Sequence, residues 1–546
     1  MYDSTYSGKR QLRVLFILLT IFFLSEVRSI AQDVYLHATN KAIYDFLDEL
    51  AGEKLISLNS AVKPYSRAFI AQQLHHADTC RNLLTLRQQN ELDFYLKDFN
   101  KELLSGRDFK KRPDLFYYTD SLFKLTVNPI AGIQYWYNKN GSNYHRWGGA
   151  EAFAYIGNHF GVYASLRDNH EDKIMGDTGY LNTRYGVSYK SGNDYSEMRG
   201  GFTYSWKWGT LALVKDHNEW GNTYHYPNII SAKAPSYAQI RLHLKPARWF
   251  EFNYFHGWLV SDVIDSAHSY TYNGIRRDVF HKKYLAANLF TFIPWQGLNL
   301  SAGNSIVYSD IGVHPAYLIP VFFYKSVDHT YNSIQNTAGQ NSQLFLDISC
   351  RLIPKMHFYY SMYLDDLSFY RMFDPDRQSN HWSMKVGYRL SNLIPDVLLT
   401  AEYTRTNPLA YRNDNLTTLY QSNSYNLGHY LFDNADVIYL ASDYKPLRGL
   451  HIRVWYEKLR KGPEYPYIRQ TNPATGVSYV WGRKFLEETI WQQQTIGLLM
   501  EYQIINDVFV FADLQKKSSE GEQERFTAPY FMGDLVTFSG GVTIGF

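Results

Sequence analysis

Three neighbouring residues near the middle of the chain have side-chain types that carbohydrate sites use. His217, Glu219 and Trp220 place an imidazole, a carboxylate and an indole within one short segment. An aromatic face can lie under a sugar ring while charged neighbours bond its hydroxyl groups, because ligand sites combine aromatic surface with a few placed polar groups. The same residues also suit a structural insertion that packs inside the molecule. A sugar site and a packing role therefore stand as alternatives.

Two adjacent carboxylates, Asp365 and Asp366, form a second candidate site. Paired carboxylates can hydrolyse a glycosidic bond, but only when they face each other across it. Neighbouring residues of a strand point to opposite faces of the sheet, so this pair does not form that geometry by itself. Carboxylates also bind calcium when other oxygen ligands join them. The structural alternative places Asp365 in an interior charge network and Asp366 at the start of a loop.

Three aromatic residues, Tyr465, Tyr467 and Trp481, lie in a long polar stretch that we interpret as an external loop. Their rings could stack on sugars, or pack on one another or on a partner.

Sequence features of enzymes and metal proteins do not occur. His281, His314 and His329 lack the mutual spacing of a zinc site, and the chain has no nucleotide-binding loop, nucleophile elbow or HExxH helix. We therefore expect no metal, no cofactor and no enzymatic activity. Cys80 and Cys350 also lack metal-ligand spacing, and we interpret them as incidental thiols.

The elements that must position these residues are strands. Residues 536–546 alternate between apolar side chains, such as Val536 and Phe538, and small or polar ones, such as Thr537 and Ser539. Alternation with a period of two is typical of a transmembrane β-barrel, whose strands face lipid on one side and a polar interior on the other. A terminal aromatic residue, Phe546, suits the closing strand of such a barrel.

The same period of two governs the chain from residue 115 onward, as in segments 238–245, 397–404, 450–457 and 498–504. A soluble β-sandwich also alternates, but it does not explain the terminal aromatic strand or the leader segment described below. The charged residues of these strands face inward in this interpretation, where they either line a substrate path or form ion-paired networks. They are Arg241, Glu402, Arg453, Glu457 and Glu501.

Short turns divide the strands, whereas longer polar stretches lie between the turns. If the eight short turns and both ends of the barrel lie on the periplasmic side, the barrel has about eighteen strands. Trp208-Gly209 is either a further turn or a bulge within one long strand. The eight turns are 157–159, 191–194, 245–248, 294–297, 353–355, 392–396, 445–449 and 505–507.

The beginning of the chain resembles a secretory signal peptide. Basic residues precede an apolar run at 14–24, and Ser29-Ile30-Ala31 supplies small residues for cleavage. The apolar run is too short to span a membrane as a helix, which needs about 20 residues. The remaining chain has no long apolar run, and the mean hydropathy of the whole sequence is −0.37. A helical membrane protein is therefore excluded, but a barrel is not.

Composition supports a membrane barrel. Aromatic residues make up 17% of the chain, with 47 tyrosines and 12 tryptophans, and barrels place such residues in girdles at the membrane interfaces. The formal net charge is +3, and it falls to +1 without the four basic and two acidic residues of segment 1–31. Nucleic-acid binding is therefore not expected, because it needs a basic surface.

Residues 32–110 show a helical period. Three amphipathic helices are expected: one after Asn40, one after Ser66, and one over 89–104. They are too few for a large core of their own, so we expect them to pack against the periplasmic mouth of the barrel. The predicted organisation is a signal peptide at 1–31, a periplasmic helical plug domain at 32–110 and an outer-membrane β-barrel at 111–546.

Four stretches of the chain resemble the Wzi-type capsule-assembly outer-membrane proteins, including the RemB-like gliding-motility proteins of Bacteroidetes. Asn222-Thr223 stands where these proteins often have Pro-Gly. The stretches are AVKPYSR at 61–67, LALVKDHNEWG at 211–221 with APSY at 234–237, SIVY at 305–308 with YLIP at 317–320 and Asp328-His329, and SMYLDD at 361–366.

The resemblance implies an eighteen-stranded barrel with a helical plug, in the outer membrane of a Gram-negative bacterium, and we expect a member of the Bacteroidetes. It also implies a lectin-like anchor for capsular or other surface polysaccharide, with outer-membrane lipid as its other contact. The alternative is an accessory subunit of a gliding, adhesion or secretion machine that binds other envelope proteins. A transport pore and an outer-membrane hydrolase are weaker alternatives, because a plug opposes an open channel and no catalytic residues are carried over.

Overall fold

The computed structural model describes residues 32–103, 114–190, 192–335, 340–367, 380–471, 473, 476 and 478–545. The predicted signal peptide at 1–31, the end of the predicted plug domain and Phe546 lie outside these residues. Among the helices within them, none is both long and apolar enough to cross a membrane.

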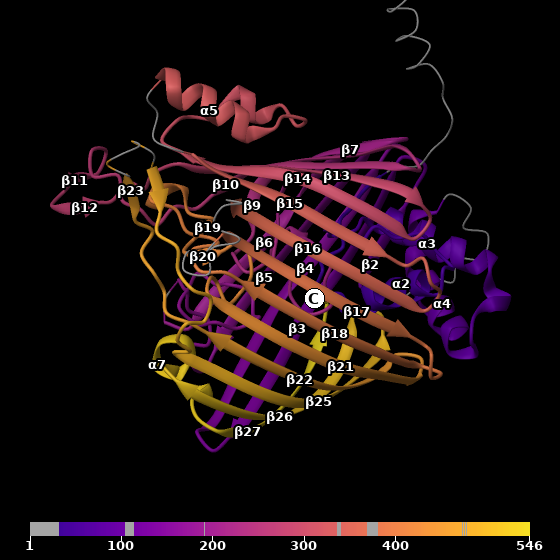
Figure 1. Cartoon of the computed structure of the whole chain (residues 1–546). Helices are drawn as coiled ribbons and strands as arrows, with labels where there is room; N and C mark the ends of the chain where they lie inside the picture. The colour runs from indigo at the N-terminus through magenta and orange to yellow at the C-terminus, as the bar shows by residue number, and fades with distance from the viewer. Residues whose placement is uncertain are drawn as a thin grey trace, which may run out of the picture.

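Eighteen antiparallel strands in the described part of the chain form a closed barrel (Figure 1). Each strand pairs with the next along the chain, and β27 closes the ring on β3, with Ile544 opposite Ala131. The predicted barrel of about eighteen strands is confirmed. The strands are β3 (Phe123–Asn138), β4 (Gly141–Ile156), β5 (Phe160–Glu171), β6 (Asp194–Trp206), β7 (Gly209–Asp216), β9 (Tyr237–Ala247), β10 (Phe250–Leu259), β13 (Lys283–Trp295), β14 (Leu298–Ser309), β15 (Asn341–Cys350), β16 (Met356–Asp366), β17 (His381–Ser391), β18 (Val397–Thr406), β21 (Ala435–Leu447), β22 (Leu450–Lys461), β25 (Trp491–Ile505), β26 (Val508–Gly521) and β27 (Leu535–Ile544).

Shorter strands form ribbons outside or within this ring. Strand β2 extends the wall by pairing with the first part of β3, and the other short strands form two-stranded pairs. Strand β2 covers Phe116–Thr119. The pairs are β1 (Val62–Lys63) with β8 (Glu219–Trp220), β11 (Tyr270–Tyr272) with β12 (Ile275–Arg277), β19 (Gln421–Ser422) with β20 (Tyr425–Asn426), and β23 (Arg469–Thr471) with β24 (Ser478–Val480).

The period of two sets which side chains face outward. On β27, Val536 and Phe538 are 57% and 49% exposed, whereas Thr537 and Ser539 are buried. Alternate residues of a strand point to opposite faces of the sheet, so the apolar set lies on the outer wall and the polar set faces the interior, as expected.

One of the predicted short turns is wrong. Residues 191–194 do not connect two strands at the short-turn end, because β5 ends at Glu171 and the whole segment 172–193 leads to β6 at the opposite end. Of the two alternatives at Trp208-Gly209, the further turn is right, because residues 207–208 connect β6 to β7 between Trp206 and Gly209. Eight turns therefore still share one end of the barrel, which we call the short-turn end. The longer connections and the two-residue turn between β3 and β4 lie at the other, the long-loop end.

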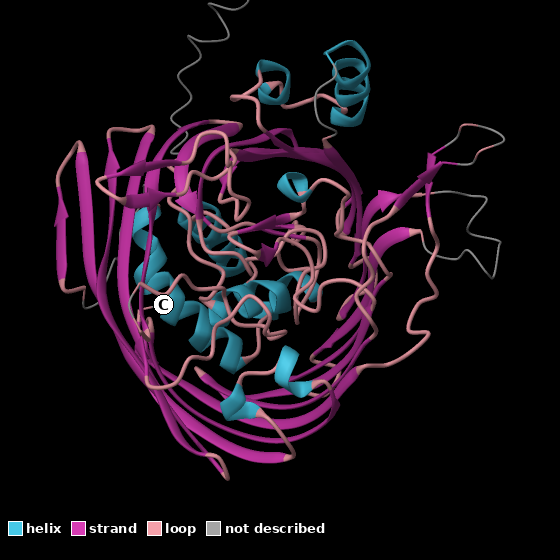
Figure 2. Ribbon diagram, turned by 90° about the vertical axis from the view of Figure 1, so that its left-hand side faces the viewer, coloured by secondary structure: helices cyan, strands magenta, loops and turns pink. Residues whose placement is uncertain are grey.

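The N-terminal helices lie against the short-turn end, within the outline of the barrel in Figure 2. Helix α3 begins after Ser66, whose hydroxyl accepts a hydrogen bond from the Phe69 backbone N–H, as predicted. Helix α4 begins three residues before the predicted start, because Thr85 and Gln88 form a capping box there. The helices are α2 (Lys41–Gly52), α3 (Arg67–Thr79), α4 (Leu86–Phe99), α5 (Tyr324–Gln335) and α7 (Gln523–Phe526), with 3₁₀ turns η1 (Arg81–Leu83), η2 (Asn100–Glu102), η3 (Pro315–Leu318), η4 (Leu416–Thr418) and η5 (Pro529–Phe531).

Two connections fold into the barrel instead of away from it (Figure 2). The insertion 217–236 and the loop 407–434 meet there, since the Tyr411 hydroxyl donates to the Asn228 carbonyl over 2.7 Å. Ile230 and Tyr411 belong to one buried cluster with inward-facing residues of the wall, such as Phe255. The interior is thus packed with protein above the helices.

The connection between β14 and β15 instead covers the outside of the wall, where Figure 2 shows α5 beyond the barrel outline. Asn288 is on the same strand face as the exposed Phe292, and its amide donates to the carbonyls of Pro320 and Phe322 over 2.8 and 3.0 Å. The Tyr254 hydroxyl donates to the Tyr317 carbonyl. The outer surface of β10, β13 and β14 is therefore buried near the long-loop end.

Candidate functional site

The paired aspartates end strand β16 at the long-loop end. Asp365 is on the inward face of the strand with the buried Tyr363, and Asp366 is opposite His381 of β17. The ring of Tyr467, from the loop after β22, lies 5.7 Å from the His381 ring. Burial, followed by the negative charge of Asp365, raises the pKa of Tyr467 to about 12. The structure therefore brings three of the predicted site residues together, with a tyrosine hydroxyl that stays protonated at neutral pH.

A surface groove lies on the other face of the same loop. It has a volume of about 300 Å³ and is lined by Pro466, Ile468, Gln470, Trp481 and Arg483. This volume is at the lower end of the roughly 300–1,000 Å³ range of ligand pockets. Neighbouring residues of this extended loop point in alternate directions. Residues 466, 468 and 470 therefore face the groove, while Tyr467 points towards His381. Trp481 is 53% exposed and presents an open aromatic surface.

The groove combines polar donors with this aromatic surface. The Arg483 guanidinium lies 4.8 Å from the centre of the Tyr465 ring, and Gln470 adds an amide on β23. The loop hairpin β23–β24 holds the two sides together through three residue pairs, Arg469 with Val480 among them. Together these residues can stack on a sugar ring and bond its hydroxyl groups.

The other predicted cluster lies inside the barrel, apart from the loop residues. Trp220 is 2% exposed, and its ring packs edge-on against Phe255 and Phe345 at 5.2 and 6.3 Å. Glu219 is opposite Lys63 in the β1–β8 ribbon, and burial raises the pKa of its carboxyl despite the nearby lysines. Trp220 has no open face for a sugar ring here, and it holds the insertion 217–236 in place.

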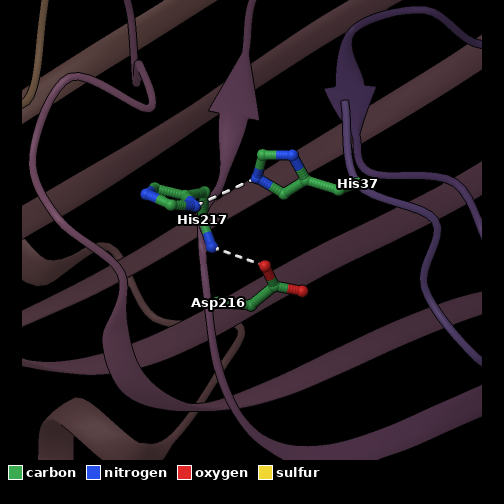
Figure 3. A group of neighbouring side chains, drawn as sticks. All are labelled: His37, Asp216 and His217. Carbon is green, nitrogen blue, oxygen red and sulfur yellow. Dashed lines mark hydrogen bonds between the residues drawn. The ribbon is translucent and has the colours of Figure 1, made fainter. Parts of the chain in front are cut away.

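His217 faces a residue that the sequence interpretation missed. Its Nδ1 is 3.1 Å from Nε2 of His37, which lies before the first helix (Figure 3). The adjacent Asp216 accepts hydrogen bonds from the Tyr163 hydroxyl over 2.8 Å and from Arg199 over 3.2 Å. No pattern in the sequence predicts this meeting, because His37 and His217 are 180 positions apart.

His37, Asp216 and His217 are the one group among the described residues whose atoms lie close enough together to hold a metal ion. Burial lowers the pKa of both imidazoles, and the charge of Arg199 adds to this effect. The Glu197 and Asp216 carboxylates act in the opposite direction on His217. We assign these residues to a hydrogen-bonded interior network.

The inward-facing charges of the strands also form networks, which was one of the two predicted alternatives. Glu402 accepts from Lys385 over 2.7 Å, Glu457 pairs with His225 over 2.8 Å, and Arg453 bonds Asp443 over 2.5 Å. Glu402 also accepts from the Tyr224 backbone N–H of the insertion. These carboxylates hold the insertion against the wall.

Comparison with known proteins identifies the fold. No protein-family model matches the chain, and no curated protein sequence matches it. The structure is similar to that of Wzi, an outer-membrane protein involved in group 1 capsule assembly in Escherichia coli and a carbohydrate-binding β-barrel. The TM-score is 0.56 at 13% sequence identity, covering 94% of this chain and 100% of Wzi.

Other solved barrels match less well. OccAB2 of Acinetobacter baumannii has a TM-score of 0.42 at 9% identity, over 77% of this chain and 97% of its own. OprD of Pseudomonas aeruginosa has a TM-score of 0.40 at 10% identity, over 77% and 94%. The predicted likeness to gliding-motility proteins stays a prediction. The chain has an eighteen-stranded outer-membrane barrel fold similar to that of Wzi, and this confirms the resemblance to Wzi-type barrels at the level of the fold.

Proposed function

We propose that this protein binds surface polysaccharide at the long-loop end and retains it at the outer membrane without acting on it chemically. The observation that carries the proposal is the open groove beside Trp481, next to the Tyr467 and Asp365 cluster. A packed interior adds support, because it leaves the loops and not the lumen as the surface for a long polymer. The carbohydrate-binding barrel Wzi, with a similar fold, points the same way.

The proposal assigns no catalysis. Asp365 and Asp366 are consecutive residues at the end of β16, where the pairing with β17 shifts register between Leu364 and Asp366. Two neighbouring residues of one strand are not placed on the two sides of a glycosidic bond, as hydrolysis requires.

The proposed orientation places the long loops outside the cell and the short turns, with helices α2–α4, in the periplasm. In this arrangement residues 1–31 direct export, residues 32–110 form a periplasmic plug and residues 111–546 form the barrel of a Gram-negative outer membrane. A cysteine introduced at Trp481 should react with a membrane-impermeant maleimide on intact cells, and one at Trp295 should not. The reverse pattern would overturn the orientation.

The function is tested by measuring polysaccharide on cells and in the medium of a deletion strain. We expect polysaccharide to move from cells to medium and to return on complementation. Trp481→Ala should restore less cell-bound polymer than the wild type. Trp295→Ala is the matched control, since Trp295 is 65% exposed at the other end of the barrel. Unchanged attachment in the deletion strain would refute the proposal.

A second candidate function, an accessory subunit of an envelope machine, rests on the β11–β12 hairpin at the long-loop end (Figure 1). Tyr270, Tyr272 and Ile275 are 58%, 62% and 58% exposed there. Clustered exposed apolar side chains mark protein-binding surfaces. A partner that co-purifies with the wild type and is lost from a Tyr272→Ser, Ile275→Ser variant would support this function, whereas an unchanged partner set would exclude the hairpin as the contact.

A further inference from the structure

A cavity at the short-turn end shares Asn218 and Trp220 with the interior cluster described above, whereas most of its other lining residues belong to none of the sites described so far. It has a volume of about 250 Å³ and lies between helix α3 and strands β7, β9 and β10. The segment around Tyr35 and the β1–β8 ribbon close its inner side, and the turn at Lys207 and Trp208 lies at its rim. The volume corresponds to about eight water molecules at about 30 Å³ each. The cavity therefore has room for a small polar ring and not for a polymer strand.

Buried polar groups of the wall are left with unused hydrogen-bonding capacity. Arg241 is 6% exposed and donates from Nε to Gln239 and from Nη2 to the His217 carbonyl, so that Nη1 donates to no described residue. Asn218 and Asn253 use their amide nitrogens for contacts with the protein, while their side-chain oxygens accept from none of the described groups. All three residues line the cavity, where a ligand can complete their hydrogen bonds.

Positive charge exceeds negative charge around the cavity. Its described lining includes four cationic side chains, those of Lys63, Lys207, Arg241 and Lys245, and two carboxylates, those of Asp33 and Glu251. Glu251 already pairs with Lys245 over 3.2 Å, and Arg241 forms no ion pair with a described carboxylate. The free donors of Arg241 and the ammonium of Lys207 at the rim therefore favour an anionic group.

Aromatic surface completes the lining. Tyr35, Tyr65 and Phe69 contribute their rings, and the guanidinium of Arg241 lies 5.0 Å from the centre of the Tyr35 ring. An inorganic anion needs no aromatic surface, and an acyl chain needs none of the polar atoms. A sugar ring uses both, because it has apolar C–H faces and a rim of hydroxyl groups.

We propose that this cavity binds a sugar unit that carries a carboxylate or phosphate group, with the anionic group at Arg241 and Lys207 and the hydroxyl groups at Asn218 and Asn253. Such a unit can come from an acidic polysaccharide or from a phosphorylated glycolipid headgroup. The site is independent of the groove at Trp481, since the two lie at opposite ends of the barrel, and either can exist without the other.

The test uses the whole mature chain in detergent micelles and saturation-transfer NMR with three probes: D-glucuronate, glucose 1-phosphate and D-glucose. We expect transfer to at least one anionic probe and much weaker transfer to glucose. Arg241→Gln should weaken binding by about tenfold or more, the usual loss for a hydrogen bond to a charged group. Lys207→Gln, a change at an exposed turn residue, should weaken it several-fold, and Trp481→Ala should leave it unchanged.

Each outcome decides the matter. Preference for glucuronate assigns the site to acidic polysaccharide, and preference for glucose 1-phosphate assigns it to a glycolipid headgroup. Equal transfer to all three probes, no transfer to any, or unchanged binding in both cavity variants overturns the proposal. Signal lost only in Trp481→Ala would place the sugar in the groove, refuting the cavity site while supporting the proposed function. Arg241→Lys, which keeps the charge, should recover part of the affinity.

Discussion

Arg87 of helix α4 and Asp396 of the turn between β17 and β18 form an ion pair with 2.6 Å between Nε and Oδ1. The same guanidinium bonds Glu91 over 2.5 Å and also Glu49 of helix α2. Lys445, near another short turn, reaches Glu49 over 3.2 Å. One arginine thus joins two helices to the barrel wall, and it fixes how the helical region is seated on the short-turn end.

Replacing Arg87 with methionine should loosen the helical region. Glu49 and Glu91 would lose the arginine that bonds both of them while they stay buried, and breaking a buried ion pair costs about 3–5 kcal/mol. Limited proteolysis should then cut within 41–102 while the barrel keeps its heat-dependent gel mobility. Arg81→Met is the matched control, because Arg81 pairs with Asp78 and Asp93 but is 39% exposed, and such pairs contribute about 0–1 kcal/mol. Equal protease resistance in the two variants would contradict the assigned role.

The buried histidine pair should make stability fall with acid. Burial, aided by Arg199, lowers the pKa of His37, and burial lowers that of His217. Both groups then bind protons more readily in the unfolded chain. Their contribution to the free energy of unfolding is therefore complete above about pH 6.5 and is lost as pH falls towards the folded-state pKa. Each group can contribute a slope of up to about 1.4 kcal/mol per pH unit.

Urea unfolding between pH 7 and pH 5 checks this expectation. The double variant His37→Asn, His217→Asn should lose less stability over that interval than the wild type. His76→Asn, at an exposed position of helix α3, should behave like the wild type. If the free energy of unfolding changed equally with pH in all three proteins, these histidines would not cause the loss of stability in acid.

Substitutions of Trp220 and Trp481 should have different effects, one on stability and the other on polysaccharide binding. Trp220→Ala removes a ring packed among Phe255 and Phe345, and such a change costs about 3–5 kcal/mol. Trp481→Ala removes a mostly exposed ring and should change stability by less than about 0.5 kcal/mol. Binding of surface polysaccharide per folded molecule should fall only for Trp481→Ala. A loss of binding in folded Trp220→Ala protein would restore Trp220 as a ligand residue.

The packed interior should make the barrel a poor channel. We expect no stable open-channel conductance in planar bilayers, since the insertion 217–236 and the loop 407–434 fill the space above the helices. A variant lacking residues 32–103 should still show no large pore, because both connections remain. A large and stable open-channel conductance from the intact protein would instead support transport.

The strand pattern was readable from the sequence because it is local. Lipid on one side and polar protein on the other impose a period of two that five predicted segments show. The strand number was right although one turn was wrong, because the further turn left open at Trp208-Gly209 takes its place. Residues 191–194 have turn chemistry, but turns of the same composition occur at both ends of a barrel. The true turn at 207–208 is aromatic, and Trp206 and Trp208 pack edge-on at 5.3 Å, as residues of an interfacial girdle do.

The sites were less predictable because they depend on contacts between distant segments. The composition of 217–220 suggested sugar binding, yet the segment folds inward, and nothing near it in sequence specifies that direction. Tyr467, Asp365 and His381 meet only because the ends of β16 and β17 and the loop after β22 lie together. The cavity at Arg241 needs the N-terminal helices and the wall at once, so the residues that line it gave no local signal.

The β14–β15 connection covers one side of the barrel, so the outer surface differs between the sides that lie in the plane of the membrane. Around most of its circumference, a neighbouring barrel or lipid would meet bare apolar wall. At β10, β13 and β14 the same neighbour would meet the β14–β15 connection, which Asn288 holds against the wall by hydrogen bonds. Val321 and Phe323 of this connection are 60% and 50% exposed. Neighbouring proteins in the membrane should therefore pack preferentially against one side of this barrel.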